Sequence, residues 1–150
     1  MAINVQKYSL RVVKENGGRY DLDKKITTPD SAIKTFVEVL DLDKRSEEVF
    51  AMLTVDTQSQ LTGVFEVSVG NLNSSLISPR EVFKRAILNN AYSVLLAHNH
   101  PSGIPQPSQD DIQITERLVE AGELLGIEVL DHLIVGSKHN FVSLKEREII

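Results

Sequence analysis

Apolar residues recur at helical spacing in the first third of the chain. Ile33, Phe36, Val37 and Leu40 follow one another at i, i+3, i+4 and i+7, which forms one face of an α-helix. Thr28 precedes this pattern and is a suitable N-cap, because its hydroxyl can accept a hydrogen bond from a free amide of the first turn. The pattern therefore predicts a capped helix with one buried face.

Short apolar runs predict the strands. Val49–Val55 and Leu61–Val69 are separated by a polar turn and are expected to form an antiparallel hairpin, and Ala91–Ala97 is expected to be a central strand. Two more helices are predicted, with N-caps at Ser78 and Ser108, and three more strands, at Ile127–Leu130, Leu133–Val135 and Phe141–Leu144. The alternation of helices and strands predicts a single α/β domain with a mixed sheet between helices.

The first 27 residues precede this pattern and are expected to be an N-terminal extension to a domain over residues 28–150. Tyr8 to Glu15 alternates apolar and polar residues as a strand does, and Asn16-Gly17-Gly18 follows as a turn signal. We therefore expect residues 1–27 to form an attached strand or hairpin.

Composition excludes several classes of chemistry. There is no cysteine among the 150 residues, which excludes disulfides, thiolate catalysis and cysteine-based zinc sites and fits a cytoplasmic protein. No apolar run approaches the length that crosses a bilayer, so no membrane partner is expected. The net charge of −5 does not support nucleic-acid binding, which requires a basic face.

The stretch AHNHPSGIPQPSQDD, residues 97–111, concentrates the candidate chemistry. His98 and His100 follow a buried strand, and residues i and i+2 of an extended backbone point to the same side. Two imidazoles that converge at the end of a strand are suitable zinc ligands. The proline-rich loop then leads to a helix that begins at Ser108 and carries Asp111 in its first turn, so this helix can return a carboxylate to the histidines.

The same residues allow structural interpretations. Ser108 and Asp111 also form a capping box, and Asp110 is the competing carboxylate. A zinc hydrolase further requires a general base, and Glu48, between the first helix and the first core strand, is a candidate. From the residues alone, Glu47 is an equal alternative.

Three polar residues near these elements are assigned structural roles. Asn99 is expected to point away from the metal and to brace the loop. His132 is expected at the start of a strand, with a role in packing or hydrogen bonding rather than in the site. His139, in a turn, is expected to be exposed.

Residues 97–111 resemble the signature HxHPSGxxxPSxxD of the RadC-like JAB domain, a bacterial branch of the JAMM (MPN-plus) metallohydrolases. All fixed positions of that signature are present: His98, His100, Pro101, Ser102, Gly103, Pro107, Ser108 and Asp111. The similarity extends from about Thr28 to Leu144. The chain has only a short segment before it, so we expect a short form without the helix-hairpin-helix region of full-length RadC proteins.

The resemblance implies a JAMM/MPN (cytidine-deaminase-like) fold, with a curved mixed sheet flanked by helices. It implies one zinc ion per chain, bound by His98, His100 and Asp111, and a hydroxyl of Ser108 that hydrogen-bonds the oxyanion or the water. In that family the base glutamate ends the first helix and lies two residues before the first bulky apolar residue of the core strand. Glu48 fits this register and Glu47 does not.

The function implied by the resemblance is zinc-dependent hydrolysis, and we expect a metallopeptidase or isopeptidase that acts on a peptide or a protein conjugate. The alternative is a DNA repair or recombination factor of mobile elements, in which the metal site serves a nuclease or a structural role. A zinc deaminase is excluded because its PCxxC element requires cysteine. The sequence predicts neither the substrate nor the oligomeric state.

Overall fold

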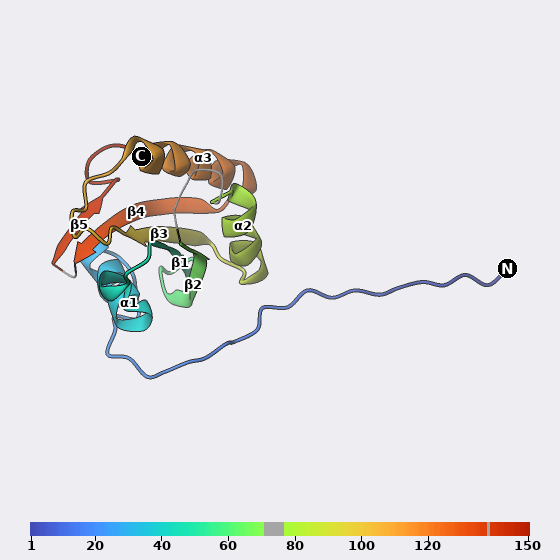
Figure 1. The fold of residues 1–150 in the computed structure, drawn as a ribbon. Coiled ribbons are helices and arrows are strands. Elements are labelled where there is room, and N and C mark those ends of the chain that lie inside the picture. The colour runs from blue at the N-terminus through green and yellow to red at the C-terminus, as the bar shows by residue number, and fades with distance from the viewer. Residues whose placement is uncertain (71–76, 138) are drawn as a thin grey trace.

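The computed structural model describes residues 1–70, 77–137 and 139–150, and shows one α/β domain with helices on both faces of a five-stranded sheet (Figure 1). The predicted fold class, a mixed sheet flanked by helices, is confirmed. In chain order the described elements are α1 (Pro29–Leu40), a short 3-10 helix (Leu42–Lys44), β1 (Val49–Val55), β2 (Leu61–Val69), α2 (Pro79–Leu88), β3 (Ser93–Asn99), α3 (Gln109–Leu125), β4 (Glu128–Ser137) and β5 (Asn140–Ser143).

The strand order is β2-β1-β3-β4-β5. β1 is antiparallel to both β2 and β3, as the predicted hairpin requires, and β4 is antiparallel to β5. β3 and β4 are parallel, and α3 is the crossover between them. In such a unit the carboxyl end of the first strand and the start of the helix lie on the same side of the sheet, which is where α/β proteins build their sites.

β1 divides the core between the two faces of the sheet. All seven of its residues are buried. Val49, Ala51 and Leu53 pack with α1 on one face, whereas Phe50 and Met52 pack with α2 and α3 on the other. A strand covered on both faces has to be apolar throughout, which explains why Val49–Val55 shows no alternation.

Capping determines where α1 and α3 begin. Thr28 accepts a hydrogen bond from the amide of Ser31, and Ser108 accepts one from the amide of Asp111. In both helices the third residue returns the bond to the cap, which completes a capping box. α3 ends at Gly126, whose φ of 71° is left-handed and therefore favours glycine. The predicted caps Thr28 and Ser108 are confirmed.

The N-terminal segment differs from the prediction. Residues 1–23 contain no strand and run away from the domain as an exposed arm (Figure 1). The strand predicted over Tyr8–Glu15 is therefore wrong, and the Tyr8 side chain is exposed. Alternation makes a strand only where a neighbouring backbone supplies hydrogen-bond partners. The first such pairing is an isolated bridge between Lys25 and Gln60.

Two other boundaries also differ. α1 ends at Leu40, so Glu48 does not end this helix but lies immediately before β1. The strands predicted at Ile127–Leu130 and Leu133–Val135 are one strand, β4. Asp131 does not break it, because this buried carboxylate accepts hydrogen bonds from the Ser143 hydroxyl and from the amides of the two residues His132 and Lys145.

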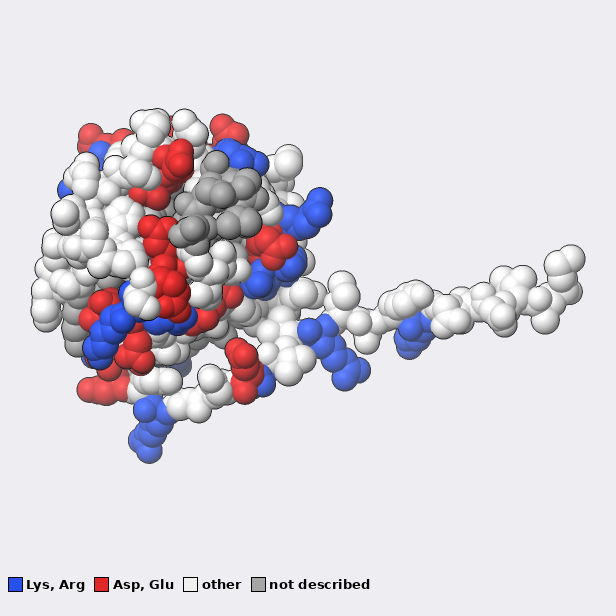
Figure 2. Space-filling view, in the orientation of Figure 1, with Lys and Arg blue, Asp and Glu red and all other residues white. Residues whose placement is uncertain are grey.

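Charge is unevenly distributed on the face that Figure 2 shows. Asp and Glu side chains form a band down the middle of the domain, while Lys and Arg side chains lie in separate places around it, at its lower end, on its right flank, near its top and along the N-terminal arm. As far as its described residues go, this face has no continuous basic surface of the kind that nucleic-acid binding requires. Among the described helices, none is long and apolar enough to cross a bilayer.

Candidate metal centre

His98, His100 and Asp111 meet where β3 ends and α3 begins. One ligand atom from each of them lies within 4.8 Å of the others, and no other described residues form such a group. His98 Nε2 is 3.0 Å from His100 Nε2 and 3.1 Å from Asp111 Oδ1, and His100 Nε2 is 3.4 Å from Asp111 Oδ2. The structure thus brings together three predicted ligands and leaves Asp110 outside the cluster.

These separations suit a small divalent cation. Zinc binds nitrogen and oxygen ligands at about 2.0–2.2 Å, and a tetrahedral arrangement then places its ligand atoms roughly 3.3 Å apart. The two imidazole nitrogens, 3.0 Å apart, and the contact of 3.1 Å between His98 Nε2 and Asp111 Oδ1 are close to this spacing, and one ligand atom from each of the three residues lies within 4.8 Å of the others. Two imidazoles and one carboxylate are also a donor set that zinc accepts. The cluster therefore could hold a zinc ion.

Asp111 serves both the cap and the cluster. Its Oδ2 accepts a hydrogen bond of 2.7 Å from the amide of Ser108, while its Oδ1 lies nearest His98. Burial alone would raise the pKa of Asp111, but the contacts of its carboxylate with His100 and His98, which are hydrogen bonds when the rings are protonated, outweigh it and hold this pKa well below its usual range. The carboxylate is therefore held in place as an anion, which is the form that binds a cation.

His100 is oriented by the loop that follows it. Its Nδ1 lies 2.9 Å from the carbonyl oxygen of Ile104, and since a carbonyl only accepts, the ring donates there. In the neutral ring this leaves the lone pair on Nε2, which points into the cluster. In the protonated ring Nε2–H donates to Asp111 instead, and this hydrogen bond raises the pKa of His100, with the charge of Glu48 acting in the same direction.

The proline-rich loop that connects β3 to α3 packs closely on β4. Gly103 has a φ of 80°, and its amide donates to the carbonyl oxygen of His100. A Cβ on Gly136 of β4 would lie 2.3 Å from the carbonyl oxygen of Gly103 and 3.0 Å from Pro105 Cδ. Only glycine at position 136 lets the loop lie this close, so β4 helps to set the separation of His100 and Asp111.

A cavity of about 310 Å³ opens beside the cluster. It is lined by Glu48, His100, Pro101, Ser102, Ser108, Asp110 and Asp111. Ser108 Oγ accepts from the amide of Asp111, so its hydroxyl hydrogen can be donated to another group. The cavity is therefore lined by the Glu48 carboxylate and the Ser108 hydroxyl together with His100 and Asp111 of the cluster.

Glu47 has a different environment from Glu48. Arg45 Nη2 lies 2.8 Å from Glu47 Oε1, and the hydrogen bond from Arg45 lowers the pKa of Glu47. Both residues are half-buried, but only Glu48 lines the cavity. The geometry favours the register that places Glu48 at the site, and its role as the base remains a prediction.

Asn99 holds the backbone on both sides of Glu48. Its Oδ1 accepts from the amide of Val49 at 2.7 Å, and its Nδ2 donates to the carbonyl oxygens of Glu47 at 3.0 Å and Arg45 at 3.2 Å. Asn99 was expected to brace the loop; it instead ties the end of β3 to the segment that enters β1. The residue between the two histidines therefore positions the segment that carries Glu48.

His132 is the residue that sequence reasoning undervalued. It lies inside β4 rather than at a strand start, is fully buried, and its Nε2 is 2.8 Å from His98 Nδ1. The available signal was a histidine within an almost continuous apolar run, because a polar ring in a buried strand requires a partner. His139, by contrast, is exposed as predicted.

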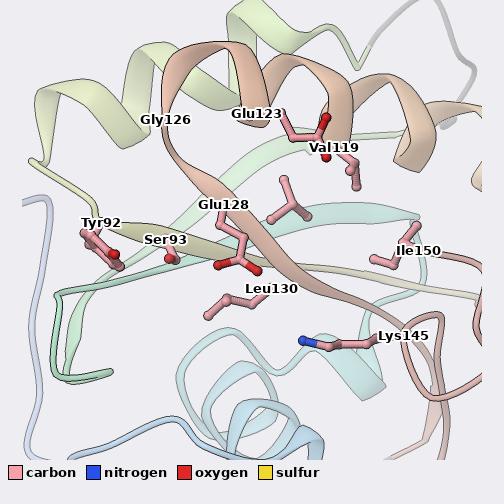
Figure 3. A pocket seen from close by; sticks show the side chains of 11 residues that line it. Tyr92, Ser93, Val119, Glu123, Gly126, Glu128, Leu130, Lys145 and Ile150 are labelled. Carbon is pink, nitrogen blue, oxygen red and sulfur yellow. The ribbon is translucent and has the colours of Figure 1, made fainter.

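A second, larger pocket lies away from the cluster. Its volume is about 400 Å³, and its lining includes Glu123 of α3, Glu128 of β4 and Lys145 beyond β5 (Figure 3). No cluster residue lines it. Size therefore does not identify the site here; the converging ligand atoms do.

Comparison with known proteins gives a consistent result. The family described as RadC-like JAB domain matches residues 26–149. A UPF0758 protein of Moorella thermoacetica is 58% identical over 103 residues, which are 69% of this chain and 44% of that protein. A UPF0758 protein of Clostridium perfringens is 44% identical over 126 residues, which are 84% of this chain and 54% of that protein. The chain spans about half the length of these curated relatives.

The match over residues 26–149 contains α1, the whole sheet and α3, and with them every residue of the cluster and its cavity. The fold and the converging His-His-Asp group agree with the resemblance seen in residues 97–111. This chain belongs to the RadC-like JAB domain family.

Proposed function

We propose that this protein is a zinc-dependent hydrolase that cleaves an amide bond in a peptide or a protein conjugate. The observation that carries the proposal is the cluster of His98, His100 and Asp111 beside an open cavity. Three protein ligands with an open position distinguish catalytic zinc sites from structural ones, which are closed by four. We propose one zinc ion per chain, because the described residues contain a single cluster of this kind.

Zinc in such a site lowers the pKa of its water to about 7 and polarises a carbonyl group. Glu48, on the cavity wall, would take the proton of the attacking water and pass it to the leaving amine. The Ser108 hydroxyl, whose oxygen already accepts from the amide of Asp111, would donate its hydrogen to the oxyanion. Asp111, whose contacts hold its pKa well below the usual range, would offset part of the charge of the cation.

The test is a hydrolysis assay of the zinc-loaded chain against three substrates: unmodified peptides, isopeptide-linked conjugates, and single- or double-stranded DNA. We expect new amino groups from one of the first two, and loss of this activity when a chelator removes the zinc. Cleavage of DNA without amide cleavage would replace the peptidase proposal with a nuclease. Chelator-resistant amide cleavage would contradict the role of the metal.

A further inference from the structure

A chain of buried side chains connects His98 to the backbone of Asp111. His98 Nδ1 is 2.8 Å from His132 Nε2, His132 Nδ1 is 2.6 Å from Thr115 Oγ1, and Thr115 Oγ1 donates to the carbonyl oxygen of Asp111 at 2.6 Å. His98 Nε2 then lies 3.1 Å from Asp111 Oδ1. The contacts form a closed ring that ties a ligand from β3 to a ligand from α3 through β4.

Along this series of hydrogen bonds, each donor fixes which atom of the next residue accepts. Thr115 has a single hydroxyl hydrogen, and the carbonyl oxygen of Asp111 can only accept it. Thr115 Oγ1 therefore accepts from His132 Nδ1–H. In a neutral His132 the lone pair is then on Nε2, which accepts from His98 Nδ1–H. His98 Nε2 is left with its lone pair directed at the cluster.

Burial keeps this order of hydrogen bonds free of competition from water. His132 and Thr115 are both at 0% exposure, and His98 is at 1%. His132 faces Thr115 Oγ1 with one ring nitrogen and His98 Nδ1 with the other, and a ring with one donor and one acceptor satisfies both contacts. Phe50 packs against the rings of both His98 and His132, which restricts their rotation.

We propose that Thr115 and His132 are positioning residues that hold His98 as the Nδ1–H tautomer and thereby set the metal affinity of the cluster. Neither residue touches the cavity, so neither takes part in the chemistry directly. The inference rests on the metal binding in the proposed function, but on no assumption about the substrate. Partners behind metal-bound histidines typically change metal affinity by about 10–100-fold.

The decisive variant is Thr115→Val, which keeps the shape of the side chain and removes the hydroxyl. Its matched control is Thr35→Val in α1, because Thr35 is also fully buried and donates to the carbonyl oxygen four residues earlier, but contacts no histidine in the described network. Thr115→Ser is the conservative variant, because it keeps the hydroxyl. Zinc affinity is measured for each full-length chain by competition with a chromophoric chelator.

We expect Thr115→Val to weaken zinc binding by about 10–100-fold, Thr115→Ser to restore it to within a few-fold of the original chain, and Thr35→Val to leave it unchanged. Equal affinity in Thr115→Val and the original chain would overturn the inference while the metal site stands. An equal loss in Thr35→Val would overturn it too, since the effect would then be general destabilisation. No zinc binding by the original chain would instead sink the proposed function.

A spectroscopic readout covers the case in which Thr115→Val does not fold. In the original chain labelled with ¹⁵N-histidine and freed of metal, long-range ¹H–¹⁵N spectra report which ring nitrogen carries the proton. We expect the proton on Nδ1 in both His98 and His132. A proton on Nε2 of His132 would reverse the whole chain of donors and overturn the inference.

Discussion

The side-chain oxygen of Asn99 accepts a hydrogen bond of 2.7 Å from the backbone amide of Val49, fifty residues earlier in the chain. Because the amide group of Asn99 also donates to the carbonyl oxygen of Glu47, this one side chain holds the backbone on both sides of Glu48. The residue between the two candidate histidine ligands thus links the cluster to the proposed base.

The Asn99→Leu variant tests whether Asn99 positions Glu48, the proposed base, relative to the candidate metal cluster. We expect hydrolysis to fall while zinc content is retained, because the three ligands keep their own supports. The buried amide of Val49 is left without a partner, which costs about 1–3 kcal/mol in the free energy of unfolding. Activity per bound zinc, together with a denaturant titration, measures both effects. The control is Asn89→Leu, which loses a hydrogen bond to Thr54 away from the cavity and should keep its activity per folded molecule.

The Glu48→Gln variant tests the proposed base. Gln keeps the size of the side chain but cannot take a proton, so we expect kcat to drop by roughly 10²–10⁴-fold with zinc still bound. Glu47→Gln is the matched control: it makes the same change one residue away, at a carboxylate paired with Arg45, and should retain activity. If Glu48→Gln is as active as the original chain, Glu48 is not the base.

The His98→Ala/His100→Ala double variant tests the ligands. We expect stoichiometric zinc in the purified original chain and none in the variant. Because a ligand that binds only the folded state stabilises it by mass action, added zinc at 100 times its Kd should raise the stability of the original chain by about 2.7 kcal/mol. Thermal unfolding with and without zinc measures this difference. Equal zinc content in both proteins would refute the site.

The Gly136→Ala variant tests the packing of the loop against β4. A Cβ there would meet the carbonyl oxygen of Gly103 at 2.3 Å, which is backbone and cannot rotate away. We expect the loop to shift, zinc affinity to fall, and stability to decrease by about 1–3 kcal/mol. Gly17→Ala, where nothing lies within 4 Å, is the control and should change neither quantity. Unchanged zinc affinity in Gly136→Ala would show that the loop does not set the separation of the ligands.

Local chemistry explains what could be predicted from the sequence. The helix caps Thr28 and Ser108 depend on contacts over three residues, and the convergence of His98 and His100 depends on the two-residue period of a strand. These features depend on residues that are close in the sequence, so they do not depend on how distant segments pack. The third member of the cluster, Asp111, is the third residue of the next helix and completes the capping box of Ser108, and the sequence offered Asp110 as the alternative carboxylate.

Contacts between distant segments could be decided only by the tertiary structure. The pairing of His98 with His132 spans 34 residues, and it exists because β3 and β4 are parallel neighbours beneath α3. The different environments of Glu47 and Glu48 also depend on distant contacts. Arg45 pairs with the carboxylate of Glu47, and Asn99 donates a hydrogen bond to the carbonyl oxygen between the two residues. The alternating segment Tyr8–Glu15 does not form a strand, because no other described segment pairs with its backbone. The periodicity of a sequence specifies which face of a segment is apolar. Whether the segment forms a strand depends on a neighbouring strand that pairs with its backbone, and only the tertiary structure supplies that neighbour.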